Sequence, residues 1–177
     1  RQMCIRDRIL PNSEVLIKNV GINPTRAGLI KVCEAMGADL TLLNEDHENA
    51  EPTADLLVRT SSLRGCVIEG DIIPTLIDEL PTIAMMACFA EGTTVIRDAA
   101  ELKVKESNRI AIMVENLRAM GADVEETEDG MIIHGGKPLH GAVVDSHKDH
   151  RIAMTFAVAA LAADGETEII DADCVDI

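Results

Sequence analysis

Short sequence patterns recur along this chain of 177 residues, and this repetition limits what it can fold into. The stretch 35–39, AMGAD, returns unchanged at 119–123, and EGTTVI at 91–96 resembles DGETEI at 164–169. Each pattern falls between an expected helix and an expected strand, and the two pairs are spaced differently. We therefore expect repeated α/β units with loops of variable length, packed side by side around a shared core. Helices of different units can then begin on the same side of the molecule.

Hydrophobic periodicity mixes helices and strands along the whole chain, so the expected fold class is α/β with mixed α+β character. Gly121 follows one expected helix at the position where glycine commonly ends a helix. Asp129 and Gly130 predict a hairpin whose turn places both residues at positive φ. The expected helices are 78–90, 107–120 and 150–163, and the expected strands are 15–20, 38–43, 56–60, 66–69, 93–97, 124–127, 131–134, 142–145 and 168–171.

Composition excludes two classes of function. The chain is 47% hydrophobic but has only two Phe and no Trp or Tyr, so aliphatic residues and Met must fill its core. Its net charge of -15 and its lack of aromatic stacking platforms argue against binding nucleic acid. The longest apolar runs, 83–90 and 156–163, are too short for a bilayer, which needs about 20 residues, so no membrane partner is expected.

The cysteines are scattered and odd in number, which is typical of reduced thiols in a cytosolic protein. We therefore expect a cytoplasmic location and no disulfide framework. They stand at positions 4, 33, 66, 88 and 174. The opening residues 1–8 show neither alternation nor an apolar face, and we expect them to be foreign to the fold.

Charged residues gather at the starts of the three expected helices, at 78–79, 105–109 and 149–151. Unpaired N–H groups and the helix dipole make such positions suitable for phosphate or carboxylate, and arginine adds a bidentate fork. Lys105 beside Glu106 also supplies a cation and a proton-transferring carboxyl group within one turn. These positions are therefore suited to a ligand with two anionic groups.

Two simpler readings remain open. Asp78 and Asp149 could be helix N-caps, Glu106 a first-turn acid that complements the dipole, and Arg109 part of a solvated helix face. A metal site is the other alternative, although zinc prefers well-placed nitrogen and sulfur ligands and no cysteine is near in sequence. Its candidate ligands are His140, Asp145, His147, Asp149 and His150.

The same clusters carry a family resemblance. The stretch 101–110, ELKVKESNRI, resembles the signature L-R-V-K-E-[ST]-D-R of the EPSP synthases. The stretches 145–154, DSHKDHRIAM, and 77–81, IDELP, resemble two further blocks of that family, and all three occur in the family's order. With 23–26 and 171–174, the resemblance covers the chain from about residue 10 to its end.

The resemblance implies a two-domain protein in which each domain is an inside-out α/β barrel of three βαβαββ units with helices inside. This chain would be most of one domain, residues 9–177, from the C-terminal portion. The second domain and the C-terminal tail would be missing, so the chain alone is expected to be inactive. The full-length protein is expected to be a monomer.

The resemblance also implies a reaction, the transfer of the enolpyruvyl group of phosphoenolpyruvate to the 5-hydroxyl of shikimate 3-phosphate, without metal or organic cofactor. Asp78 would accept the hydroxyl proton, and Glu106 together with Lys105 would handle the methylene proton. Lys105 would bind shikimate 3-phosphate. Arg109 and Arg151 would bind phosphoenolpyruvate, and His150 is also expected at the substrates.

Two positions depart from the family pattern: Asn108 stands where Asp is usual, and Lys148 where Gly is usual. We expect either to alter affinity, Lys148 by adding a bulky cation near the pocket. Two rival functions stay open, transfer of the same group to UDP-N-acetylglucosamine and a non-catalytic anion-binding domain of the same fold. The UDP-sugar enzymes use a reactive cysteine in a glycine-rich loop, and no cysteine stands in such a loop here.

Overall fold

The computed structural model describes residues 12–48 and 51–175. Residues 1–8, which we expect to be foreign to the fold, therefore lie outside the residues that the structure describes. In chain order the elements are β1 (Glu14–Gly21), α2 (Gly28–Ala35), β2 (Asp39–Asp46), β3 (Thr53–Arg59), β4 (Val67–Ile68), η1 (Gly70–Thr75), α3 (Leu80–Cys88), β5 (Thr93–Ile96), η2 (Ala100–Val104), α4 (Arg109–Ala119), β6 (Asp123–Glu126), β7 (Met131–His134), β8 (Val143–Asp145), α5 (His150–Ala160), β9 (Glu168–Ile170) and η3 (Ala172–Val175), where η marks a short 3₁₀ helix.

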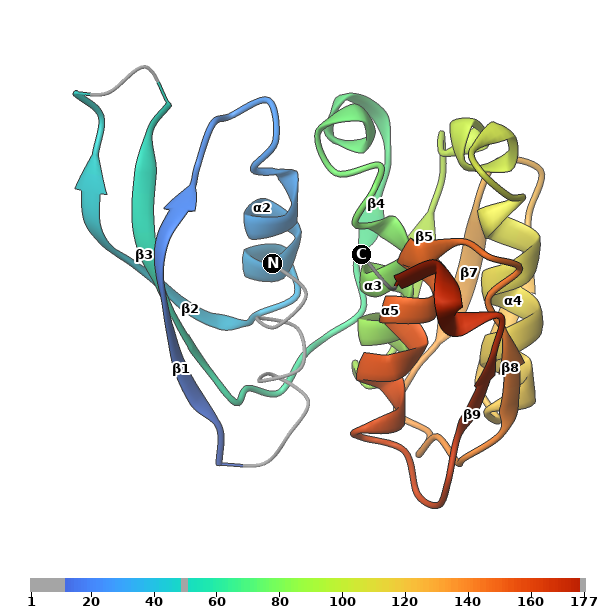
Figure 1. Cartoon of the computed structure of the whole chain (residues 1–177). Coiled ribbons are helices and arrows are strands. Elements are labelled where there is room, and N and C mark those ends of the chain that lie inside the picture. The colour runs from blue at the N-terminus through green and yellow to red at the C-terminus, as the bar shows by residue number, and fades with distance from the viewer. Residues whose placement is uncertain (1–11, 49–50, 176–177) are drawn as a thin grey trace.

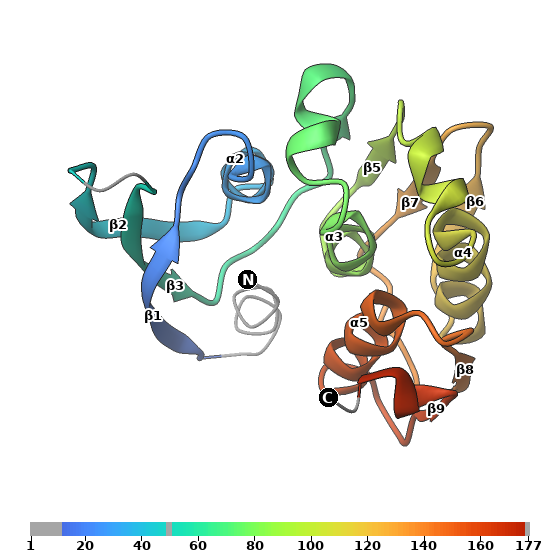
Figure 2. The same cartoon turned by 45° about the horizontal axis from the view of Figure 1, so that its top comes forward.

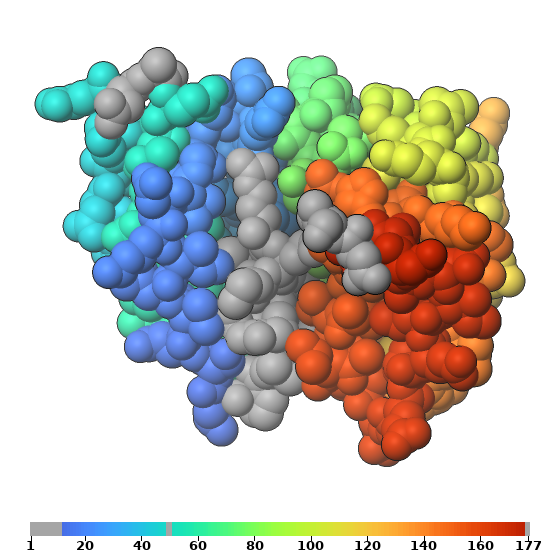
Figure 3. All heavy atoms as spheres, viewed as in Figure 1, coloured from blue at the N-terminus to red at the C-terminus, as the bar shows by residue number. Residues whose placement is uncertain are grey.

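In Figure 1, α3 and α5 lie in the middle of the molecule. The sheet of β1, β2 and β3 lies with α2 to the left of them, and β7, β8, β9 and α4 lie to the right. The described strands form an antiparallel sheet ordered β1-β3-β2, a mixed sheet ordered β4-β5-β7-β6, and a parallel pair β8-β9. Figure 2 shows α3, α4 and α5 as neighbouring coils, with β5, β7 and β6 along one side and β8 and β9 along another. In the space-filling view, the N-terminal and C-terminal elements occupy opposite sides of one face (Figure 3).

The most buried element is α3, in which every residue is buried. A helix that is apolar all round belongs in the middle of a fold, which explains its run of Ile, Ala, Met and Cys. Its one polar side chain, Thr82, reaches Thr155 of α5 through a hydroxyl–hydroxyl hydrogen bond of 3.2 Å. The main core therefore runs between the helices and the sheets that cover them.

The repeated AMGAD stretches have the same conformation. Each contains a left-handed glycine just after a helix, Gly37 with φ 76° and Gly121 with φ 88°. In both copies the N–H after the glycine binds a carbonyl of the last helical turn at 2.9 Å, Ala38 to Cys33 and Ala122 to Leu117. This is the Schellman ending, which glycine favours because it lacks a Cβ. The predicted end of the helix at Gly121 is confirmed.

The second pattern marks another structural repeat. Strands β4 and β5 are parallel and joined through α3, and β8 and β9 are parallel and joined through α5. Gly92 and Gly165, with φ 92° and 93°, lie before the second strand of each pair. In both copies the N–H of a glycine before the first strand donates to the backbone carbonyl of a residue before the second strand. Gly65 donates to Glu91 at 2.8 Å, and Gly141 donates to Asp164 at 2.7 Å. The expected repeated α/β units are therefore present.

The hairpin of β6 and β7 is confirmed, but the reason given for its turn is wrong. The strands pair antiparallel, and neither Asp129 nor Gly130 adopts a left-handed φ. The loop has four residues and closes through a Thr127 N–H to Gly130 carbonyl bond of 3.0 Å. Gly130 is needed for space instead, since a Cβ there would lie 2.0 Å from the carbonyl oxygen of Ile96.

The other expected elements are found with shifted ends. The helix expected from residue 78 begins at Leu80, with Pro81 in its first turn, where a missing N–H costs nothing. The helix expected from 107 begins at Arg109, because Asn108 caps it. The helix expected to reach 163 ends at Ala160, and the strand expected at 66–69 is only Val67–Ile68. The 3₁₀ helices were not predicted, and of α2 only the end near residue 35 was expected, without bounds.

Candidate functional site

A buried arginine joins the starts of three helices. Arg109, the first residue of α4, is 1% exposed, and its Nε donates to Asp149 Oδ2 at 2.8 Å. Its Nη2 donates to Glu106 Oε2 at 2.6 Å, and its Nη1 to Asp78 Oδ1 at 3.3 Å. Asp149 precedes α5 and Asp78 precedes α3, so one guanidinium group connects all three helix starts. The carboxylates offset the burial of Arg109 and raise its pKa above the ordinary value.

Asp149 is the other buried member of this cluster, with a side chain that is 0% exposed. Its Oδ1 caps α5 by accepting from the backbone N–H of Arg151 at 2.9 Å, while Ser107 Oγ donates to its Oδ2 at 2.9 Å. Burial alone would raise the pKa of Asp149, but the bonds from Arg109 and Ser107 outweigh burial and lower it. The carboxyl group therefore stays ionised in the fold.

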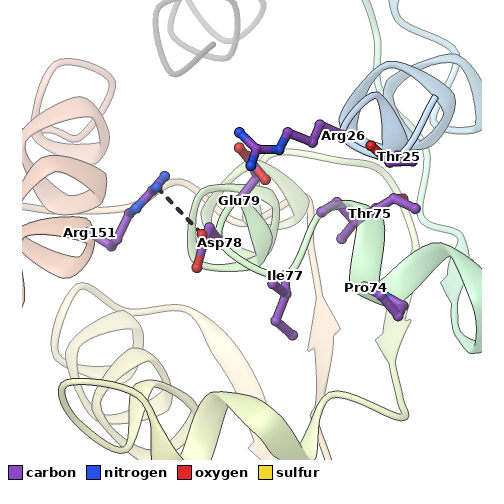
Figure 4. Close-up of a pocket in the computed structure, with 9 residues that line it drawn as sticks. Thr25, Arg26, Pro74, Thr75, Ile77, Asp78, Glu79 and Arg151 are labelled. Carbon is purple, nitrogen blue, oxygen red and sulfur yellow. Dashed lines mark ion pairs between the residues drawn. The ribbon is translucent and has the colours of Figure 1, made fainter. Parts of the chain in front are cut away.

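Asp78 lies at the edge of an open cavity of about 490 Å³. Figure 4 shows Arg151 reaching across to it from α5, and their Nη2 and Oδ2 atoms are 3.7 Å apart. The opposite wall comes from the turn before α2, which carries Thr25 and Arg26. The remaining lining residues are Pro74, Thr75, Leu76, Ile77 and Glu79.

The predicted site residues are thus only partly brought together. Asp78, Glu106, Arg109 and Arg151 belong to one network of ion pairs. Lys105 instead forms an ion pair with Glu101 of η2. His150 is the first residue of α5 and is half-buried beside the network.

The two departures from the family pattern have local explanations. Asn108 is the N-cap of α4, and its Oδ1 accepts from Ala111 N–H at 3.2 Å, a task that Asp performs equally well. Lys148 has φ 59°, in the left-handed region that favours glycine. The left-handed backbone at position 148 therefore explains why the family usually has glycine there.

Sequence reasoning missed several residues of the site. Thr25, Arg26 and Thr75 line the cavity, although in the sequence only 23–26 carried a signal, as part of the family resemblance. Ser107 was quoted only as part of a motif, yet it binds Asp149. Gly28 allows the turn that carries Thr25 and Arg26 to pack closely against Thr75, since a Cβ at position 28 would lie 2.2 Å from Thr75 Oγ1.

The metal alternative finds no support in this geometry. Within residues 12–48 and 51–175 no group of three or more His, Cys, Asp or Glu side chains is arranged to hold a metal ion. Asp149, one of the candidate ligands, is instead bound by Arg109 and Ser107. The same described residues contain no helix that is long and apolar enough to cross a membrane.

Comparison with solved structures first defines the class. The chain superposes on the enolpyruvyl transferase NikO from Streptomyces tendae with a TM-score of 0.76 over 98% of its length. At 20% identity this likeness shows the fold alone, which is the expected inside-out α/β fold of the enolpyruvyl transferase type. EPSP synthase from Acinetobacter baumannii is more similar, with a TM-score of 0.94 and 43% identity over 98% of this chain and 41% of that one.

Sequence comparison then gives the family. The family model described as EPSP synthase (3-phosphoshikimate 1-carboxyvinyltransferase) matches residues 8–177, so the chain belongs to the EPSP synthase family. Its relatives include the 3-phosphoshikimate 1-carboxyvinyltransferases of Synechococcus sp. (strain JA-3-3Ab), 57% identical over 96% of this chain, and Alkaliphilus oremlandii, 52% identical over 99%. The chain spans only 38% and 41% of the lengths of these two relatives.

Proposed function

We propose that this chain forms one wall of the active-site cleft of an EPSP synthase, which transfers the enolpyruvyl group of phosphoenolpyruvate to shikimate 3-phosphate and releases phosphate. The observation that carries the proposal is the convergence of three helix starts, through Arg109 and Asp78, beside an open cavity. Such helix starts favour anions, and both substrates are phosphorylated. Residues 9–177 are then most of one domain, from the C-terminal portion of a two-domain protein.

The proposed chemistry divides the proton transfers between two carboxylates. Asp78 takes the proton of the 5-hydroxyl of shikimate 3-phosphate while the hydroxyl oxygen bonds to C2 of phosphoenolpyruvate. In the same step Glu106 with Lys105 protonates C3. In the second step C3 returns a proton to the Glu106 and Lys105 pair, and the C2–O bond to phosphate breaks. Inorganic phosphate leaves and the double bond between C2 and C3 is restored. The side chains of Asp78 and Glu106 are 45% and 56% exposed, so both are within reach of a ligand.

The cations have different accessibility in this arrangement. Arg151 is 29% exposed and borders the cavity, so it can contact a carboxylate or phosphate directly. Arg109 is buried and its donors already meet three carboxylates, so direct contact with phosphoenolpyruvate requires Asp78 or Glu106 to move aside. Lys105 must likewise leave Glu101 to hold a phosphate. We place His150 at the edge of the same site.

Phosphate release by the full-length protein from both substrates tests the proposal. Arg151→Gln should lower kcat/KM at least about 100-fold, because a charge-assisted contact to the substrate is lost. Arg97→Gln is the matched control, since Arg97 forms an exposed pair with Glu69 and lies outside the cavity lining. It should change the rate less than about twofold.

Calorimetric titration separates the rivals. Shikimate 3-phosphate should bind the full-length protein, and phosphoenolpyruvate should bind more tightly in its presence. Binding of UDP-N-acetylglucosamine with turnover would instead establish the sugar-nucleotide reaction. If none of these ligands shows ordered binding, the non-catalytic anion-binding domain is the function that remains.

A further inference from the structure

Asn116 is a buried polar residue of α4 that the proposed chemistry does not use. It is 4% exposed, and its carboxamide makes two bonds to the backbone of one residue at the end of β8. Its Nδ2 donates to the Asp145 carbonyl at 2.8 Å, and its Oδ1 accepts from the Asp145 N–H at 3.0 Å. A side chain thus substitutes for a strand partner at this point, which fixes α4 against the end of β8.

The same helix holds the other end of the following loop. Arg109 lies seven residues before Asn116, which is two helical turns, so both side chains lie on the same face. Asn116 binds Asp145 and Arg109 binds Asp149, the first and last residues of the loop 145–149. Ser146 adds a third attachment, since its Oγ donates to the Asp171 carbonyl at 2.9 Å.

The held loop has an unfavourable backbone. His147 and Lys148 both have positive φ, 49° and 59°, in a conformation that costs a non-glycine residue about 1 kcal/mol or more. Consecutive residues of this kind persist only where their surroundings hold them. The attachments at Asp145, Ser146 and Asp149 provide that restraint.

We propose that Asn116 is a positioning residue for the proposed enolpyruvyl transfer, and this inference rests on that proposed function. By fixing Asp145, it holds the loop so that Asp149 meets Arg109 and caps α5, the helix that carries Arg151. Asn116 does not line the cavity beside Asp78. Its loss releases the loop, loosens the Asp149–Arg109 contact and lets Arg151 shift relative to Asp78. A displacement of about 1 Å at a reacting group can cost up to about 100-fold in rate.

The test uses the full-length protein, labelled with 15N-arginine, with Asn116→Leu and the milder Asn116→Ser. Arg118→Met is the matched control, because Arg118 also fastens α4 by one bond, from its Nε to the Val124 carbonyl at 2.9 Å, but away from the loop. The Arg109 Nε–H signal, assigned with Arg109→Lys, should exchange with solvent at least about tenfold faster in both Asn116 variants. In the control it should be unchanged.

Turnover is the second readout. We expect kcat to fall about tenfold in the Asn116 variants. In Arg118→Met it should fall less than about twofold, even where this control loses as much thermal stability as the Asn116 variants. Unchanged Arg109 exchange would overturn the proposed link, and altered exchange with normal kcat would overturn its role in the reaction. If wild-type protein shows no turnover, the proposed function fails, while the exchange experiment still judges the link from Asn116 to Arg109.

Discussion

Lys148 illustrates how a single residue can conflict with its backbone. At φ 59° its Cβ meets steric strain that glycine would not. We predict that Lys148→Gly raises the free energy of unfolding by up to about 1 kcal/mol, partly offset by the greater freedom of glycine in the unfolded chain. Lys148→Ala, which removes the charge but keeps the Cβ, should bring no gain. Urea denaturation of the three proteins measures the difference, and an equal gain from alanine would assign the effect to charge.

Cys88 should be inert in the native protein. Its thiol is 2% exposed at the end of α3, and burial raises its pKa to about 12. Because the thiolate is the reactive species, alkylation at pH 8 should modify Cys88 only after unfolding, whereas the half-buried Cys174 should react in the native state. Peptide mass spectrometry after timed labelling reports both sites. Rapid native labelling of Cys88 would contradict its burial.

Among the elements, the hairpin of β6 and β7 depends on close packing at its turn. We predict that Gly130→Ala lowers the free energy of unfolding by about 2 kcal/mol or more, because its Cβ would overlap the backbone carbonyl of Ile96 on β5. Gly21→Ala is the matched control, since a Cβ at Gly21 meets nothing within 4 Å. Thermal unfolding of both variants measures the contrast. Equal melting temperatures would show that the turn can shift to make room.

Local signals predicted most elements, and tertiary packing accounts for the errors. Alternation and helical periodicity depend on short stretches, so β1, α4 and the hairpin could be recognised from them. The turn at Gly130 was misread because its reason lies in β5, which is distant in sequence. Short elements such as η1 carry too few residues for a periodic pattern.

The candidate site was predictable in part for a related reason. Repetition indicated that helix starts could share a side, and Asp78, Arg109 and Arg151 do meet. The burial of these side chains and the identity of their ion-pair partners could not be predicted. The sequence gives no measure of how deeply Arg109 lies, or that Lys105 turns toward Glu101. The burial of Arg109 follows from side-chain packing between units, whereas the Lys105–Glu101 pair is a local contact that depends on the unpredicted helix η2.

At the scale of the whole molecule, the repeated units and the ion-pair network depend on each other. The repeats bring α3, α4 and α5 together, and their starts place acidic side chains around one buried guanidinium. A buried charge is costly unless it is fully paired, so this network also couples the three helices energetically. The stability of the entire domain should therefore depend on the ionisation of a few groups at the site.

Acid unfolding tests this coupling through Asp149. Its pKa is lowered in the fold from the ordinary 3.8, so its ionised form contributes stability above about pH 3.8, and that contribution is lost as the pH falls through the lowered value. Asp149→Asn keeps an N-cap for α5 but removes the charge that balances Arg109. We predict a loss of about 3 kcal/mol at pH 7. Below pH 3.8 the wild type should lose stability more steeply than the variant, so the two curves converge. Denaturant titrations from pH 2.5 to 7 measure this, and parallel curves would show that Asp149 does not carry the acid sensitivity.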